Sequence, residues 1–180
     1  LPLSNEAILE AQMLMLQAHN ILNPANGAPI TVPAQDMVLG LYYITKLRKG
    51  AKGEGLTFYG PEEALIAYNE GKVDIHAIIN VVAKDLDENG NIVDKMIKET
   101  SVGRVIVNEI VPAEVGYLNT IISKKSLRDI ISDVIKAVGV ARACEFLDGI
   151  KNLGYKMAFE GGLSFNLGDI IIPKEKEELV

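Results

Sequence analysis

Apolar positions recur every three or four residues over several stretches of the chain, which is the spacing of an amphipathic helix. One such stretch covers residues 4–20, where Ser4 is placed to cap the helix and a wide apolar face predicts a well-buried element. A second stretch, 36–46, is apolar on nearly every side. A third, 60–72, begins with Pro61 after one glycine, and proline suits the first turn of a helix. These patterns predict three helices in the first half of the chain.

The C-terminal third shows the helical spacing twice more. Residues 127–139 carry an apolar face and end at Gly139, and either Ser123 or Ser126 can begin this helix. Residues 141–162 form a second predicted helix, which ends at a pair of glycines. We therefore expect two helices separated by a glycine.

Other stretches are rich in β-branched residues and predict strands. The first, 56–59, is brief, whereas 74–84 and 91–99 are long enough to pair with each other. The sequence DLDENG at 85–90 joins these two, and its Asn-Gly pair is typical of a β-hairpin. Residues 163–173 are expected to form a turn followed by a strand.

The segment TSVGRVIVNEIVP at 100–112 fits either a strand or a short helix. We expect a strand that runs into Gly103 and a helix that starts after Arg104. Taken together, the patterns predict an α+β fold, with several helices around a small mixed or antiparallel sheet that contains a β-hairpin.

The hairpin loop also shares part of the EF-hand calcium pattern. The matching residues are Asp85, Asp87, Asn89 and Gly90. The last position of that pattern requires a bidentate acid, and this chain has Met96 there. A hairpin turn is therefore the favoured interpretation, and a calcium-binding domain is the weaker one.

The composition allows one domain, or one domain with pieces of its neighbours. The chain has 180 residues, of which 48% are hydrophobic, so an aliphatic core can form. A net charge of −6 argues against a surface that grips nucleic acid broadly by itself. The single cysteine, Cys144, fits a reducing compartment, and no apolar run reaches the ~18 residues that cross a bilayer. We therefore expect a cytoplasmic protein.

Candidate functional residues lie in three loops rich in proline, glycine and asparagine: NPANGAP, VPAQD and GGLSFNLGD. Prolines lower the entropy lost when a loop becomes ordered, and glycines let the backbone approach another group closely. The polar side chains that these loops present are Asn26, Gln35, Ser164, Asn166 and Asp169. Such loops suit the lining of a passage or docking on a larger assembly. Alternatively, the Asn and Asp side chains satisfy their own turns.

These motifs resemble segments of the largest subunit of multisubunit RNA polymerases, the bacterial beta-prime subunit. The most specific is NILNPANGAPITVPAQDMVLGLYYIT at residues 20–45. KGEG, GPEEA, TSVGRVIVNEIVP and GLSFNLGDIIIP follow in the order in which that family carries them. The similarity covers essentially the whole chain.

The resemblance implies a fragment of a larger multidomain subunit. Residues 1–19 would end the active-site domain, 20–172 would form the pore domain beside the secondary channel, and 173–180 would start the funnel region. The implied reaction of the parent enzyme is nucleotidyl transfer to an RNA 3′ end with Mg²⁺. The aspartates that bind Mg²⁺ would lie upstream of Leu1. The resemblance therefore implies no catalytic residue, metal ligand or cofactor in these 180 residues, and an isolated fragment without activity.

The partners implied by the resemblance are the beta, alpha and omega subunits, the DNA template and RNA within the full complex, nucleoside triphosphates, and transcript-cleavage or channel-binding factors. Gln35 and Asp36 occupy the family's Gln-Asp position in the loop nearest the active centre, and Asn26 lies in the preceding loop. With Ser164, Asn166 and Asp169, they would line the channel or support its lining. Many relatives have glycine where this chain has Asn166. The alternative function is a non-catalytic protein-docking module with structural loops.

Overall fold

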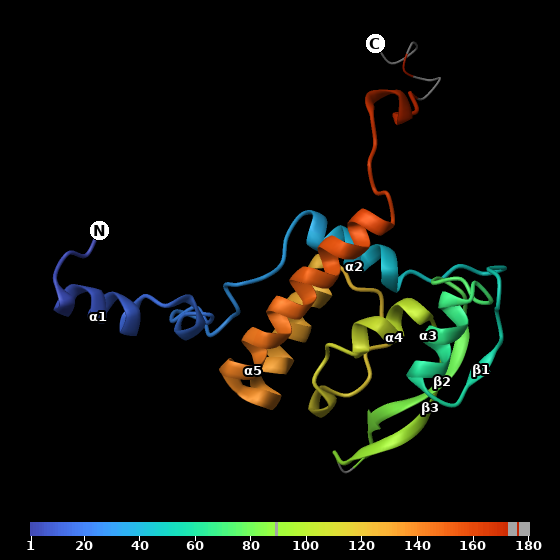
Figure 1. The fold of residues 1–180 in the computed structure, drawn as a ribbon, viewed down its shortest axis with the longest axis horizontal. Coiled ribbons are helices and arrows are strands. Elements are labelled where there is room, and N and C mark those ends of the chain that lie inside the picture. Colours follow the sequence, from blue (N-terminus) through green and yellow to red (C-terminus); the bar gives the residue numbers. More distant parts are fainter. Residues whose placement is uncertain (89, 173–175, 177–180) are drawn as a thin grey trace.

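The computed structural model describes residues 1–88, 90–172 and 176. A central body carries two arms, one at each end of the chain (Figure 1). The body contains four α-helices and a small sheet, which confirms the predicted α+β class. Its helices are α2 (Asp36–Thr45), α3 (Pro61–Asn69), α4 (Val102–Asn108) and α5 (Lys124–Glu160), with a 3-10 turn η2 (Ala113–Val115) between the last two.

Three strands form one mixed sheet in the order β1-β2-β3. The short strand β1 (Thr57–Phe58) is parallel to β2 (Ile79–Leu86), and β2 is antiparallel to β3 (Ile92–Thr100). The predicted hairpin and the mixed sheet are both confirmed. Gly90 has a φ of 79°, which suits the tight hairpin turn, whereas Asn89 lies outside the described residues.

Two apolar clusters hold the body together, and α4 contributes to both. Val107 belongs to the cluster formed mainly by α2 and α5. Val105, on the other side of α4, belongs to the cluster between the sheet and α3. Because opposite sides of one short helix enter the two clusters, α4 joins the helical layer to the sheet.

The long helix α5 is two helical segments that meet at Gly139, as the sequence predicts. Gly139 has a φ of 79° and a ψ of 174°, and the two segments lie side by side in Figure 1. Ser123 caps the first segment, and Ser126 completes a reciprocal capping box with it. Within the described part of the chain, no helix is both long enough and apolar enough to span a membrane.

Two predicted strands are wrong. The strand expected to run into Gly103 ends earlier, at Thr100. Ser101 is still extended, but it accepts a hydrogen bond from the Arg104 amide and so begins α4 at Val102. In the C-terminal arm, the described residues 163–172 contain a 3-10 turn, η3 (Leu167–Asp169), and no strand. No neighbouring strand reaches this arm to supply backbone partners (Figure 1).

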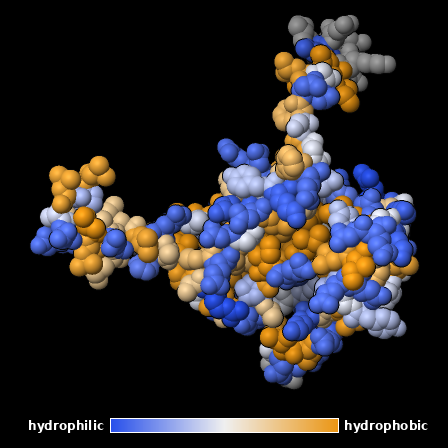
Figure 2. Space-filling model, in the orientation of Figure 1, coloured by the Kyte–Doolittle hydropathy of each residue, from blue (hydrophilic) through white to orange (hydrophobic). Residues whose placement is uncertain are grey.

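The N-terminal helix α1 (Asn5–Leu14) is shorter and far more exposed than predicted. Ser4 caps it as expected, but no residue of the helix is buried. Leu9 is 56% exposed and Met13 is 63% exposed. Figure 2 shows apolar surface on this arm, which extends away from the body.

Candidate functional site

The first polar loop folds into a small closed turn between Ile21 and Pro29. The Ile30 amide donates to the Ile21 carbonyl at 2.8 Å, and the Asn23 amide donates to the Ala28 carbonyl at 2.9 Å. Ile21 is buried and anchors the turn on the helical core. Asn26 is exposed at its tip, where its side-chain oxygen accepts the Ala28 amide at 3.0 Å. The side-chain oxygen of Asn26 therefore satisfies its own turn.

Gln35 occupies the N-cap position of α2 with a backbone conformation that is rare for a residue with a side chain. Its φ is 52° and its ψ is −123°, a region that glycine dominates. Its side chain is exposed and makes no capping hydrogen bond. Asp36, also exposed, lies in the first turn, where a carboxylate complements the helix dipole. The strained backbone therefore holds an amide side chain free at the tip of a helix.

Helix α2 is fixed from one side by direct backbone contact with α5. A Cβ added at Gly40 would lie 2.0 Å from the Gly154 carbonyl oxygen, and one added at Gly154 would lie 2.6 Å from the Met37 carbonyl oxygen. Both helices therefore need glycine where they cross, and the contact has no side chain between them. A glycine inside a largely apolar helix, such as Gly40, usually permits this kind of close packing.

The C-terminal end of α2 is fixed by a buried guanidinium that sequence reasoning missed. Arg104 is 5% exposed, and its Nε donates to the Thr45 carbonyl at 3.0 Å. Its Nη1 donates to the backbone and side-chain oxygens of Asn119 at 3.0 and 2.8 Å. Burial lowers the pKa of Arg104. In the sequence, the buried role of Arg104 is indicated only by the position of this charged residue in the middle of an apolar run.

Thr45 extends this buried network to the segment before α5. Its hydroxyl donates to the Leu41 carbonyl at 2.8 Å and accepts the Ile122 amide at 3.0 Å. Gly103 meets the other side of the helix end, because a Cβ there would lie 1.9 Å from the Ile44 carbonyl oxygen. Helix α2 is therefore held at both ends, and Gln35 stands on a rigid support.

The three C-terminal candidates lie on the other arm. Ser164, Asn166 and Asp169 are all exposed. The Asn166 side chain accepts the Gly168 amide at 2.6 Å, and the Asp169 carboxylate accepts the Asn166 amide at 2.8 Å. These two side chains satisfy their own turn. The structure thus groups Gln35 with Asp36 but keeps the C-terminal candidates apart from them (Figure 1).

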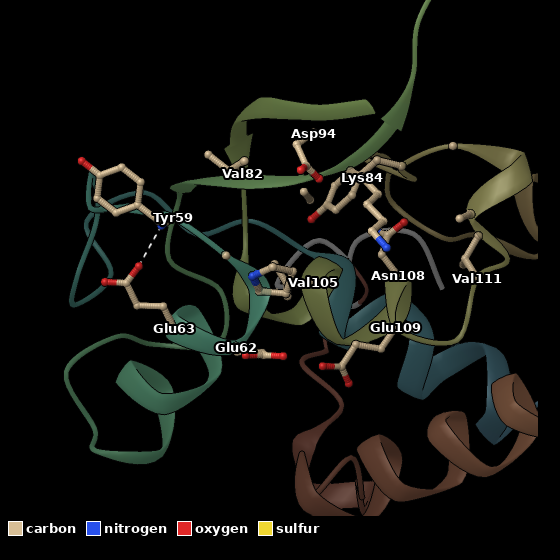
Figure 3. Close-up of a pocket in the computed structure, with 16 residues that line it drawn as sticks. Tyr59, Glu62, Glu63, Val82, Lys84, Asp94, Val105, Asn108, Glu109 and Val111 are labelled. Carbon is tan, nitrogen blue, oxygen red and sulfur yellow. Dashed lines mark hydrogen bonds between the residues drawn. The ribbon is translucent and has the colours of Figure 1, made fainter. Parts of the chain in front are cut away.

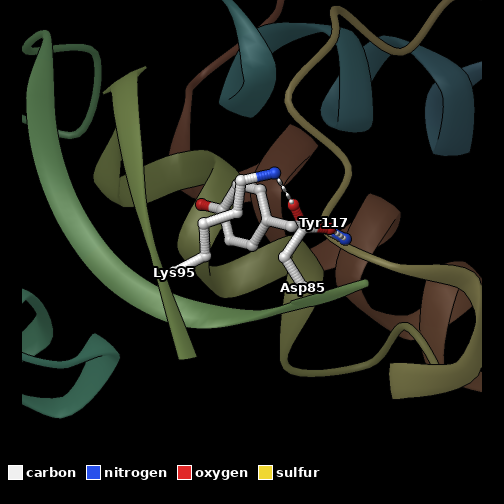
Figure 4. A network of polar contacts seen from close by, with 3 residues as sticks. All are labelled: Asp85, Lys95 and Tyr117. Atoms are coloured by element: carbon white, nitrogen blue, oxygen red, sulfur yellow. Dashed lines mark hydrogen bonds and ion pairs between the residues drawn. The ribbon is translucent and has the colours of Figure 1, made fainter. Parts of the chain in front are cut away.

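The acids of the hairpin have structural partners. Asp85 accepts the Tyr117 amide at 3.0 Å, and Lys95 approaches its other oxygen at 3.3 Å (Figure 4). Asp87 accepts both the backbone and side-chain amides of Asn91. The loop joins two strands, not two helices. Within the described residues, no three His, Cys, Asp or Glu side chains come close enough to hold a metal ion.

We expect Asp85 to stabilise the hairpin in a pH-dependent way. The Tyr117 amide, and more weakly Lys95, lower the pKa of this carboxyl. A depressed folded-state pKa adds stability above the ordinary aspartate value of about 3.9, and this stability is lost as the pH falls through the lower value. Urea unfolding of the chain and of Asp85→Asn, from neutral pH to about pH 3, should give a difference in unfolding free energy that shrinks below about pH 4. A difference that stays constant over this range would contradict the role of the ionised carboxylate.

A family model described as RNA polymerase Rpb1, domain 3, matches residues 20–170. The chain therefore belongs to this family. It is 94% identical over 180 residues to the DNA-directed RNA polymerase subunit beta' of Phocaeicola vulgatus and 88% identical to that of Bacteroides fragilis. With the subunit of Flavobacterium psychrophilum the identity is 55% over 185 residues.

Each of these alignments covers 100% of this chain but only 12% to 13% of the relative. The chain therefore spans about one eighth of the length of the proteins that it matches. The comparisons confirm the resemblance seen in the motifs.

Proposed function

We propose that this chain is the part of a bacterial RNA polymerase largest subunit that borders the passage for nucleoside triphosphates next to the catalytic centre. It would serve nucleotidyl transfer only within the assembled enzyme. Residues 1–19 would belong to the neighbouring active-site domain, 20–172 to the pore domain and 173–180 to the following funnel region. The family match over residues 20–170 supports this division.

One observation carries the proposal for this site: Gln35 is exposed in a strained conformation at the end of a helix that is fixed by backbone contacts. Strain of about 1–3 kcal/mol persists only where the surrounding structure enforces it, and such positions gather at functional sites. Asp36 stands beside Gln35, and Asn26 lies in the loop before it. The C-terminal candidates would line another part of the same passage.

Within the described part of the chain, no three possible metal ligands lie close together. We propose that the Mg²⁺ of the parent enzyme is bound by aspartates outside this chain. The residues described here would position polar groups near that centre without holding the metal.

The proposed partners are the beta, alpha and omega subunits, the DNA template, RNA, nucleoside triphosphates, and factors that enter the channel. The proposed compartment is the cytoplasm. The exposed apolar side chains of α1 support an assembly partner for the N-terminal arm, since such surfaces are usually covered. A docking module without a catalytic neighbour remains the alternative.

Substitutions of Gln35 test the proposal in an assembled polymerase that contains these residues in its largest subunit. Gln35→Ala and Gln35→Gly should both slow nucleotide addition by about tenfold, because both remove the amide that is fixed near the passage. Gln35→Gly should also stabilise the chain by about 1 kcal/mol, because glycine adopts the backbone conformation without strain. Single-nucleotide addition kinetics and thermal unfolding measure the two effects separately.

Asn152→Ala is the matched control, because Asn152 is an exposed amide side chain on α5, away from α1 and from the polar loops. It should leave nucleotide addition unchanged. If Gln35→Gly retained wild-type addition rates and only became more stable, the side chain would have no role at the passage, and the proposal for Gln35 would fail. Unchanged rates for both Gln35 variants would favour the docking module.

A further inference from the structure

A cavity of about 680 Å³ lies between the hairpin, the start of α3 and the segment that follows α4. Figure 3 shows side chains from all three regions around it. Its lining includes the apolar side chains of Val82, Val105 and Val111, of which the last two are buried. A cavity of this size falls in the range of about 300–1,000 Å³ that small organic ligands occupy.

Negative charge dominates the side chains that line this cavity. Four carboxylates and one ammonium group lie along it: Glu62, Glu63, Asp94, Glu109 and Lys84. Glu63 accepts the Tyr59 amide at 2.7 Å. The other three carboxylates make no side-chain hydrogen bond or ion pair with any described residue. Lys84 also forms no ion pair within the described part of the chain, although it is opposite Asp94 in the hairpin.

Stabilisation of a helix N-terminus explains only two of the four carboxylates that line the cavity. Glu62 and Glu63 lie in the first turn of α3, where carboxylates complement the helix dipole. Asp94 and Glu109 come from a strand and from the end of α4, and no such effect explains them. A concave site with apolar walls concentrates the field of these charges, so the cavity attracts cations.

The two tyrosines that line the cavity, Tyr59 and Tyr117, also favour a cationic ligand. Tyr59 is 86% exposed at the cavity, and an exposed aromatic face attracts an organic cation. Tyr117 lies deeper, and burial raises the pKa of its phenol, which therefore stays neutral. The Tyr117 hydroxyl is paired with Thr100 at 2.9 Å. The inner wall is thus neutral, and the formal charges lie on exposed residues.

We propose that this cavity binds a small organic cation that has an apolar body. The body occupies the part of the cavity lined by valines, and the ammonium group lies at the carboxylates of Glu62 and Glu109, across the cavity from Asp94 (Figure 3). Anionic ligands such as nucleoside phosphates are excluded by the same carboxylates. This site is separate from Gln35 and does not depend on the proposed role of that residue.

Three probes with one apolar body test the proposal on the full 180-residue chain: 4-phenylbutylamine, 4-phenylbutanol and 4-phenylbutyric acid. Titrations followed by amide NMR shifts should place the amine at the residues that line the cavity, with a Kd on the order of 1 mM for a ligand of this size. The alcohol should bind several-fold more weakly, and the acid should not bind measurably. Equal binding of the acid and the amine would overturn the proposal, as would amine shifts located elsewhere.

A charge-removing double variant, Glu62→Gln with Glu109→Gln, should weaken amine binding by about tenfold, because two nearby carboxylates are lost without a change in side-chain volume. The matched control is Glu10→Gln with Asp129→Asn, two exposed acids outside the cavity. It lowers the net negative charge equally and should leave amine affinity unchanged. Wild-type affinity in the cavity variant, or an equal loss in both variants, would show that the cavity carboxylates do not form the site.

Discussion

Gly40→Ala is expected to destabilise the folded chain by roughly 3 kcal/mol or more, at or above the upper end of the usual cost of overpacking. The added Cβ would lie 2.0 Å from the Gly154 carbonyl oxygen and 2.8 Å from the Ala158 nitrogen. Both are backbone atoms, so no side-chain rotation can relieve the overlap. The crossing of α2 and α5 must widen instead, and the apolar cluster around it loses contacts.

Urea unfolding or thermal melting of the 180-residue chain measures this loss, with an expected fall in Tm of roughly 6–12 °C. Gly60→Ala is the control, because a Cβ at Gly60 meets nothing within 4 Å and the residue is in extended backbone. Its cost should stay below about 1 kcal/mol, the difference between glycine and alanine at a helix N-cap. Similar losses for the two variants would mean that the crossing tolerates a side chain.

Arg104→Met is the second change with a large expected effect, about 2–4 kcal/mol of unfolding free energy. The methionine keeps much of the volume but removes three hydrogen bonds, to the Thr45 carbonyl and to both oxygens of Asn119. Within the described residues, no carboxylate forms an ion pair with this guanidinium. Its charge is instead compensated by backbone carbonyls, one of them at the negative end of the α2 dipole.

Denaturant unfolding of Arg104→Met against Arg128→Met separates this effect from a general loss of positive charge. Arg128 is exposed on α5 and should cost less than about 0.5 kcal/mol. Arg104→Lys should lose most of the stability lost in Arg104→Met, because a single ammonium cannot span Thr45 and Asn119 as a planar guanidinium does. Near wild-type stability of the lysine variant would show that only the charge matters.

The elements that could be predicted from the sequence are those in which local signals agree with the final packing. The hairpin, the helix that begins at Pro61 and the break at Gly139 each have a residue whose backbone preference fixes the local geometry. The strand expected into Gly103 failed because Ser101 provides a cap, and capping outweighed the β-branched composition that follows it.

Burial was harder to predict than local structure. The apolar stripe of α1 is real, but a stripe shows only that a helix can be covered, not that the same chain supplies the cover. The strand expected in residues 163–173 also needs a partner from elsewhere, and its described part finds none. For both arms, the missing information lies in other polypeptide segments.

At the candidate site, the sequence indicated the polar loops but not how they are supported. Gln35 and Asp36 were identified from their motif, and the positive φ of Gln35 has no sequence signal, since glycine is the usual residue for that conformation. The buried network of Arg104, Thr45 and Asn119 joins segments far apart in the chain. Such contacts depend on the tertiary fold and could not be predicted from local spacing.

The glycine crossing also links two distant parts of the molecule. Gly154 lies near the end of α5, and the C-terminal arm leaves from Gly161 directly after that helix. Since α2 and α5 touch backbone to backbone at Gly40 and Gly154, the crossing has no deformable layer at that point that could absorb a tilt of either helix. A force on the C-terminal arm that tilts α5 would therefore tilt α2 as well. The N-terminal end of α2, where Gln35 lies, would be displaced by a similar angle.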